Sequence, residues 1–262
     1  VIVTLEEPQI YIMNERGLSI KTTDEFIKLV RDGHFDYLDF GCSKGGSIAW
    51  SKRIFGGKRG LGIDIDKKKV REARTAGHDA VMFDINYIPD QKLVRFTVMY
   101  HFLEHIPSRS DVKNFVRRAC QVSEEFVFIK QPYFDADGYL FQNGLKLFWS
   151  DWTGHPNEMT TLSIFKLMRE LKSEGLLNRF SIHGKKPILS SDDPHIQAHI
   201  APPDQHHFDA DKHPPKTQGF KFEIPVFYET VIMISMPGID HYKQFRKFPT
   251  DITFFDSLGK LQ

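Results

Sequence analysis

The segment LDFGCSKGGS (residues 38–47) holds three glycines and two serines directly after an apolar run. Small residues at such a turn let backbone N–H groups approach a ligand closely, and a helix that starts there attracts a negative group. About 20 residues later, GIDID (residues 62–66) places Asp64 at the end of a second apolar run. A carboxylate in that place can accept hydrogen bonds from both hydroxyls of a ribose. The two segments together predict a nucleotide site at a strand-to-helix junction.

Apolar runs and helical patterns alternate on both sides of this segment. We expect strands over residues 35–41, 59–66, 79–86, 94–100 and 124–130, and helices over residues 22–33, 45–57, 66–77 and 108–121. Thr22 with Glu25, and Ser108 with Asp111, have the spacing of N-terminal caps. Strands rich in Val, Ile and Phe that alternate with helices of about three turns predict an α/β fold with a parallel sheet covered on both faces.

The regular alternation ends after residue 131. Residues 133–158 are rich in aromatic residues and glycine and show no clean period, whereas 160–175 predicts a helix and 179–186 and 222–236 predict two more strands. Residues 187–219 are rich in Pro, Asp and His, which predicts a long loop before the last strand. The pattern therefore predicts seven strands in a mostly parallel sheet.

We expect one domain over residues 1–262. Its predicted parts are a ligand-binding core (20–132), an aromatic cap insertion over the acceptor side (133–159), a C-terminal helix and strand pair (160–236) that contains the 187–219 insertion, and a tail (237–262). The tail is expected to dock on the core through Tyr242, Phe245 and Phe248.

The composition bears on which partners and which cellular location the sequence predicts. The 35 Lys and Arg residues nearly balance the 34 Asp and Glu residues, for a net charge of +1, so nothing in the charge predicts nucleic-acid binding. No apolar run approaches the ~18 residues of a membrane span, and residues 1–17 lack the pattern of a signal peptide. Two cysteines are too few for a disulfide framework and favour a cytoplasmic location. A homo-oligomer remains an open alternative.

The glycine segment fits one nucleotide-binding pattern better than two others. It lacks the Gly-Lys-Ser/Thr ending of a P-loop and the Gly-x-Gly-x-x-Gly of a dinucleotide site. Asp39, Gly41, Ser43 and Gly45 stand at alternate positions and resemble the Asp-x-Gly-x-Gly-x-Gly signature of class I, Rossmann-like S-adenosylmethionine-dependent methyltransferases. Ser43 replaces the middle glycine of that signature.

The resemblance continues in order along residues 35–131. It implies that Asp64 in GIDID binds the ribose, that Asp84 in FDIN contacts the adenine amino group, and that Ile85 flanks the ring. HFLEHIP (residues 101–107) resembles the Leu-Glu-His segment found in methyltransferases of small molecules and glycans, in which Glu104 and His105 brace the cofactor loop. The cofactor-binding residues that the resemblance implies are Asp39, Phe40, Gly41, Cys42, Ser43, Gly45, Asp64, Ile65, Asp84, Ile85, Tyr100 and His101.

Methyl transfer requires alignment of donor and acceptor, and an alcohol acceptor also requires a general base. His155, in WSDWTGHP, and His101, just after the fourth predicted strand, are the candidate catalytic bases. We predict no metal site, because the His and Asp residues of 187–219 follow no helix or strand spacing and suit a solvated loop. The aromatic residues of the cap are expected to pack within it and could also wall an acceptor pocket.

The sequence thus predicts a methyltransferase that uses S-adenosylmethionine, with S-adenosylhomocysteine as product. The predicted acceptor is an O or N atom of a small molecule or glycan precursor, with surface-polysaccharide biosynthesis as one setting. Two alternatives stay open: a non-catalytic binding module with the methyltransferase fold, and a nicotinamide-dependent sugar-modifying enzyme.

Overall fold

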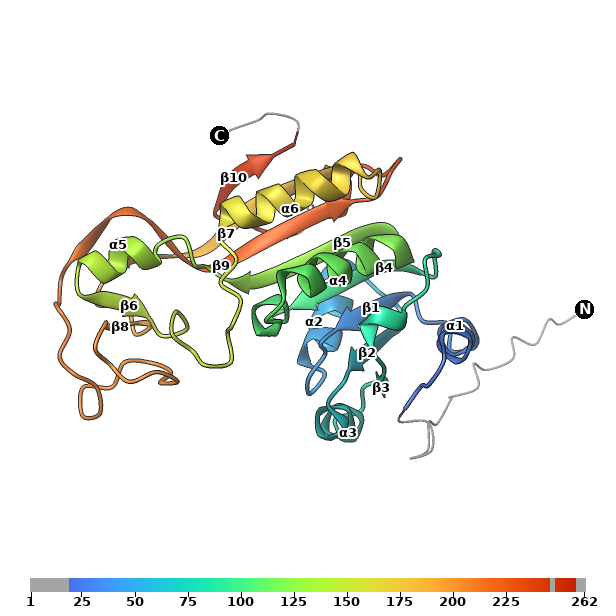
Figure 1. Ribbon diagram of the computed structural model, residues 1–262, viewed down its shortest axis with the longest axis horizontal. Helices are drawn as coiled ribbons and strands as arrows, with labels where there is room; N and C mark the ends of the chain where they lie inside the picture. Colours follow the sequence, from blue (N-terminus) through green and yellow to red (C-terminus); the bar gives the residue numbers. More distant parts are fainter. Residues whose placement is uncertain (1–18, 246–247, 258–262) are drawn as a thin grey trace, which may run out of the picture.

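The computed structural model describes residues 19–245 and 248–257, with the side chain of residue 242 left out (Figure 1). The helices are α1 (Thr23–Asp32), α2 (Gly46–Phe55), α3 (Lys67–Thr75), α4 (Arg109–Val122), α5 (Asp137–Gln142), α6 (Thr161–Ser173) and α7 (His241–Phe245), together with the 3-10 turns η2 (Ile85–Tyr87) and η3 (Leu103–His105). The strands are β1 (Tyr37–Phe40), β2 (Gly60–Asp64), β3 (Ala80–Met82), β4 (Val94–Tyr100), β5 (Ser123–Pro132), β6 (Leu145–Leu147), β7 (Arg179–Ser190), β8 (Ile196–Ala198), β9 (Lys221–Ser235) and β10 (Ile252–Asp256).

The main sheet has eight described strands in the order β10-β7-β9-β5-β4-β1-β2-β3. Strands β1 to β5 pair in parallel, and β9, β7 and β10 extend the sheet with antiparallel pairs. The α/β class and the Rossmann-like core are confirmed. The expected count of seven is wrong by one strand, because β10 lies within the segment that we expected to be only a tail. It is a short strand at the edge of the sheet and pairs with β7 alone, so no strong sequence period marks it.

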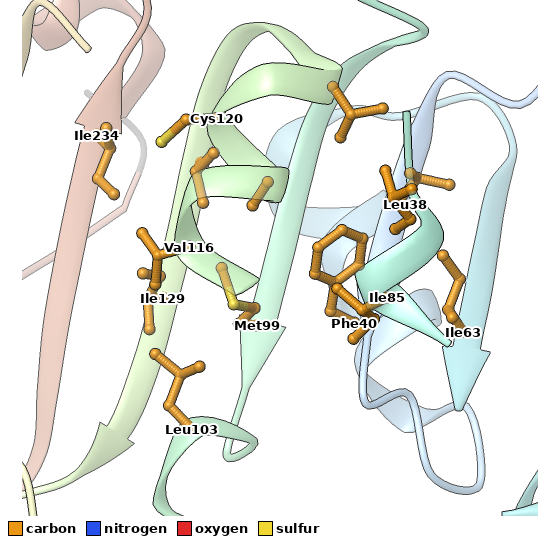
Figure 2. Packing of buried hydrophobic residues seen from close by; sticks show 14 of the residues in the cluster. Leu38, Phe40, Ile63, Ile85, Met99, Leu103, Val116, Cys120, Ile129 and Ile234 are labelled. Carbon is orange, nitrogen blue, oxygen red and sulfur yellow. The ribbon is translucent and has the colours of Figure 1, made fainter. Parts of the chain in front are cut away.

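Two hydrophobic layers cover the two faces of the sheet. Helices α1, α4 and α6 pack on one face, and α2, α3 and α7 pack on the other. Figure 2 shows the first layer, in which side chains of the sheet strands meet those of α4; the labelled residues are Leu38, Phe40, Ile63, Ile85, Met99, Leu103, Val116, Cys120, Ile129 and Ile234. Burial on both faces explains why β1, β2 and β5 read as continuous apolar runs.

The predicted caps set the ends of two helices. Thr22 accepts a hydrogen bond from the Glu25 N–H, and the Glu25 side chain in turn accepts one from the Thr22 N–H, so α1 begins with a capping box. Ser108 accepts a hydrogen bond from the Asp111 N–H at the start of α4. Both caps are confirmed. They fix the starts of α1 and α4, two helices that pack on the same face of the sheet.

The cap and the 187–219 segment form a small second sheet, at a distance from the main one in Figure 1. Strand β6 of the cap pairs antiparallel with β8 of the later segment, and Leu145 and Ile196 are both fully buried. The prediction of a long solvated loop over 187–219 is therefore wrong in part, because β7 extends to Ser190 and β8 packs against the cap. The three-residue length of β8 hides it from a periodicity analysis.

The tail docks on the α2 face of the sheet, as predicted. Phe245 and Phe248 are buried; Phe245 contacts Phe55 and Phe126, and Phe248 contacts Phe55 and Phe128. The side chain of Tyr242, also predicted to dock, lies outside the described residues. Among the residues that the structure describes, no helix is long and apolar enough to cross a membrane.

A buried chain of imidazoles and hydroxyls ties the tail to β7 and β9. Ser181 bonds both His183 Nε2 (2.7 Å) and His241 Nε2 (2.8 Å), and His241 Nδ1 bonds Ser235 (2.8 Å). Burial lowers the pKa of His183 and of His241 to about 4. Both rings are therefore neutral in the folded protein at pH values where the unfolded chain binds protons.

We expect the free energy of unfolding to fall as the pH drops from about 6.5 to about 4, by about 1–3 kcal/mol for each histidine. The sign follows because protonation in this window favours the unfolded chain. Urea unfolding of the wild type and of His183→Gln at pH 7 and pH 4.5 measures the effect. His183→Gln should lose stability at pH 7 and show a weaker pH dependence; an unchanged dependence contradicts the assignment.

Candidate ligand site at the carboxyl edge of the sheet

The turn after β1 is fastened to the end of β2 by backbone and carboxylate bonds. The N–H groups of Gly41 and Cys42 both donate to the Ile63 carbonyl, at 2.8 and 3.1 Å. The Ser43 N–H donates to Asp64 Oδ2 at 2.9 Å, and Asp64 Oδ1 accepts the Asp66 N–H at 2.9 Å. Each carboxylate oxygen of Asp64 retains acceptor capacity for one more hydrogen bond. Asp64 therefore holds the turn in place and can still bind a hydroxyl.

The turn has a left-handed backbone at alternate positions. Gly41, Ser43 and Gly45 have φ values of 69°, 47° and 89°. A Cβ on Gly41 would lie 2.1 Å from Phe102, and one on Gly45 would lie 2.4 Å from His78, so neither position accepts a side chain. Ser43 takes the left-handed conformation without being glycine, at a cost of about 1–3 kcal/mol. Such strain is typical of functional sites.

Helix α2 begins at this turn without a side-chain cap, because Gly45 is its N-cap residue. Its first N–H groups therefore point out of the helix toward any negative group placed there. Below the turn, Ser47 Oγ donates to Asp39 Oδ2 at 2.5 Å. Burial raises the pKa of the Asp39 carboxyl to about 7, although the Ser47 bond acts in the opposite direction.

A cavity of about 650 Å³ opens above the turn. Its walls come from the turn, from the first two turns of α2 and from the end of β4. The lining residues are Gly41, Cys42, Ser43, Lys44, Gly46, Ser47, Ala49, Trp50, Arg53, Tyr100 and His101. The cavity lies at the carboxyl ends of parallel strands, where open α/β sheets bind their ligands.

The residues predicted to bind a cofactor fall into three groups. Those that line the cavity are Gly41, Cys42, Ser43, Tyr100 and His101. Those buried beneath it or in the hydrophobic layers are Asp39, Phe40, Gly45 and Ile85. The others, which lie beyond its lining at the ends of β2 and β3, are Asp64, Ile65 and Asp84.

The side chains of Phe40 and Ile85 pack in the hydrophobic layer of Figure 2, so only their backbone groups can reach a ligand. Ile65 is 75% exposed at the end of β2. Asp84 caps the turn η2 by accepting the Asn86 N–H at 2.8 Å. Asp64 therefore ends β2 and Asp84 follows the neighbouring β3, at the same edge of the sheet as the cavity.

A charged network lies at the ends of β4 and β5 and within β9, next to the cavity. Lys130 Nζ is 2.5 Å from Glu229 Oε1 and donates to the Tyr100 hydroxyl at 2.6 Å. His101 Nε2 lies 3.5 Å from the same Glu229 oxygen, and His101 Nδ1 lies 3.2 Å from Glu104 Oε1. The network links the cavity wall to three buried charged side chains, those of Glu104, Lys130 and Glu229.

The two glutamates control the protonation of His101. Burial favours the neutral ring, but the hydrogen bonds to Glu104 and Glu229 outweigh it, so the pKa of His101 is raised. Burial acts to raise the pKa of Glu229 as well, but the His101 bond and the charge of Lys130 outweigh it and lower that pKa. His101 also has a left-handed backbone, with φ 51°. A second strained residue thus lines the cavity.

Sequence reasoning missed Lys130 and Glu229. Both stand within apolar strands, in EEFVFIK and in VFYETVIMIS, and a charged residue inside a buried strand is rare unless it is paired. A charged residue within each apolar strand was therefore the sequence signal that could have indicated a buried ion pair. The pairing itself depends on the antiparallel β5 and β9, which bring the two residues together from about 100 positions apart.

His155, the other predicted base, does not belong to the cavity lining. Its Nδ1 lies 3.2 Å from the Trp149 carbonyl, and its ring centroid lies 5.0 Å from that of His105. The cap aromatic residues pack with one another, since Tyr133, Phe134 and Trp149 are buried in one cluster. The expectation of cap packing is confirmed; among the described residues, the cavity takes its aromatic wall from Trp50 and Tyr100.

Comparisons with known proteins identify the fold. No family model matches the sequence, and no curated protein matches it. A solved S-adenosylmethionine-dependent methyltransferase from Archaeoglobus fulgidus is similar in structure, with a TM-score of 0.52 at 13% identity over 82% of this chain and 94% of that one. A candidate methyltransferase from Bacillus halodurans gives a TM-score of 0.50 at 16% identity over 77% and 91% of the two chains. The chain therefore has the fold of these proteins.

Removal of the Glu229 carboxylate should leave Lys130 buried without its counter-ion. We expect Glu229→Leu to lower the free energy of unfolding by about 3–5 kcal/mol, and the double variant Lys130→Met/Glu229→Leu to recover most of that loss. Urea unfolding of the wild type, both single variants and the double variant measures the coupling. If Glu229→Leu leaves the free energy of unfolding unchanged, or if the double variant is no more stable than Glu229→Leu, the two side chains do not form a stabilising buried ion pair.

Proposed function

We propose that this protein transfers the methyl group of S-adenosylmethionine to an O or N atom of a small polar acceptor. The observation that carries the proposal is the turn after β1, which is held by Asp64 and opens into a cavity at the start of α2. When bound, S-adenosylmethionine supplies a methyl group that its sulfonium already activates. The protein therefore has to bind and align the two substrates and to take up a proton from the acceptor.

The residues at the site fit each part of this cofactor. The uncapped start of α2, at Gly46 and Ser47, suits the carboxylate of a methionine moiety. Asp64 has free acceptor capacity for ribose hydroxyls, and Asp84 follows the next strand as the cap of η2, where it suits an adenine amino group. Trp50 and Tyr100 present aromatic rings 5.0 Å apart to the cavity, and such rings attract a cation.

The walls of the cavity favour a polar acceptor. Lys44, Arg53 and His101 line it, with Lys130 and Glu229 just behind. An acceptor with hydroxyl or acidic groups fits this lining better than an apolar one, and a glycan precursor is a member of that class.

His101 is the base that we propose for a hydroxyl acceptor. Its Nδ1 is oriented by Glu104, whereas its Nε2 is 3.5 Å from Glu229, at the limit of a hydrogen bond. An acceptor hydroxyl that replaces this longer Glu229 contact would meet Nε2, which can take up its proton while the ring is neutral. We prefer His101 to His155 because His101 lines the cavity.

Calorimetric titration with S-adenosylmethionine and S-adenosylhomocysteine tests the cofactor, with NADH as the control ligand. We expect micromolar binding of both sulfur compounds and no binding of NADH. Asp64→Asn should weaken S-adenosylhomocysteine binding by about 1–3 kcal/mol, because a charged acceptor is lost. Binding of NADH alone would support the nicotinamide alternative and refute the proposal.

Gly46→Ala provides a matched variant for the same titration. A Cβ at Gly46 would meet no other atom within 4 Å, and Gly46 lines the cavity. The melting temperature should hold or rise, because alanine favours the helix by about 0.5–1 kcal/mol over glycine. The affinity for S-adenosylhomocysteine should fall several-fold. If Gly46→Ala binds S-adenosylhomocysteine as tightly as the wild type does, the ligand does not bind at the start of α2.

Turnover tests the role of His101. Candidate acceptors with hydroxyl or amine groups are screened by the mass gain of one methyl group and by release of S-adenosylhomocysteine. His101→Gln should lower kcat on a hydroxyl acceptor by about 10²–10⁴-fold while leaving the affinity for S-adenosylhomocysteine nearly unchanged. A variant as active as the wild type removes His101 as the base. Cofactor binding without turnover on any acceptor supports the non-catalytic alternative.

A further inference from the structure

Three side chains outside the cavity direct ligand atoms at one point. One carboxylate oxygen of Glu104 and one ring nitrogen each of His105 and His155 lie within 4.8 Å of one another. Glu104 and His105 belong to η3, directly after β4, whereas His155 belongs to the cap about 50 residues later. The cluster therefore joins the core to the cap.

The hydrogen bonds of the two histidines fix which nitrogen is free. His105 Nδ1 lies 2.6 Å from the Gly154 carbonyl, and His155 Nδ1 lies 3.2 Å from the Trp149 carbonyl. A carbonyl only accepts, so each Nδ1 must carry the proton. In a neutral ring, Nε2 then holds a lone pair. Histidines that bind metals commonly have this arrangement, with the second nitrogen bonded to a backbone carbonyl.

Glu104 provides an independent observation. Its side chain is 1% exposed, and its Oε2 is a buried oxygen without a hydrogen-bond partner in the described structure. Its Oε1 is already occupied by His101. A buried carboxylate oxygen without a partner is costly, because it has lost its hydration. Two imidazoles with free Nε2 lone pairs and this carboxylate thus lie near one another, and none of the three supplies the others with a proton.

The backbone around the cluster is braced. Asn157 donates its N–H to the Glu104 carbonyl at 3.2 Å and its side-chain amide to the Leu103 carbonyl at 3.2 Å. Asn157 is itself buried. The cap segment that carries His155 is therefore fastened to η3 independently of any ion, so the three donors are held near one another in advance.

We propose that Glu104, His105 and His155 bind a divalent transition-metal ion, with zinc as the best match. Two imidazoles and one carboxylate form a donor set that zinc accepts, whereas Mg²⁺ and Ca²⁺ prefer oxygen alone. Ligand atoms around tetrahedral zinc stand about 3.4 Å apart, so ligand atoms that lie within 4.8 Å of one another need to close by about 1.4 Å at most. His105 is exposed, which leaves the fourth position open to water.

The ion would act as a clamp between the cap and the end of β4. Glu104 would hold it through one oxygen while the other stays bonded to His101, which lines the cavity. The site thus fixes the segment from which the cavity wall is built. It differs from the His- and Asp-rich 187–219 segment, where the sequence offers more candidate ligands. Its existence does not depend on S-adenosylmethionine binding.

Metal content tests the proposal. The full chain is treated with a chelator, dialysed, and titrated with ZnCl₂ and with CoCl₂. We expect about one equivalent of zinc per chain, a rise in melting temperature, and visible Co²⁺ absorption of a four-coordinate site. His105→Ala and His155→Ala should each lower zinc affinity by at least ~100-fold, beyond the 10–100-fold loss typical of an outer partner.

His199→Ala is the matched control, because His199 is exposed in the 187–219 segment, beside the cap and outside the cluster. It should retain the full zinc stoichiometry and affinity. His105 is exposed as well, so His105→Ala should fold and give an interpretable result even if His155→Ala does not. No stoichiometric zinc binding by the wild type, or zinc binding that His105→Ala leaves intact, overturns the proposal.

Discussion

The hydrogen bond from the Ser43 N–H to Asp64 is the interaction on which the site depends. It holds the turn after β1 against the end of β2 and keeps Ser43 in a left-handed backbone that a serine does not favour. The same turn sets the start of α2 and therefore the mouth of the cavity. Asp64 thus has a structural role in the free protein, and its remaining lone pairs allow a second role toward a ligand.

The opposite wall of the cavity is organised by charge. Tyr100 ends β4 and His101 follows it, and the buried pair of Lys130 and Glu229 contacts both. Glu104 extends the network to His105 and His155, which connects the wall to the cap. Buried charges are stable only when they are paired, so these residues fix one another's positions. The cavity therefore has one wall set by backbone geometry and the other by ion pairs.

The sequence predicted the first wall much better than the second. The Gly-rich turn, Asp64 and the strand-helix alternation are local patterns, and the structure has the elements where they were expected. The partnership of Lys130 with Glu229, the pairing of β6 with β8 and the docking of β10 all join segments far apart in the chain. Such contacts leave no period in the sequence. His155 was predicted as a catalytic base, and its proximity to Glu104 and His105 became apparent only from the fold.

The most direct test of the account is a crystal structure of the protein with S-adenosylhomocysteine. The account predicts density for the ligand across the turn after β1, with its carboxylate at the N–H groups of Gly46 and Ser47 and its ribose on Asp64. Density elsewhere, or a well-ordered turn that stays empty at saturating ligand, would contradict the claim that this turn is the cofactor site.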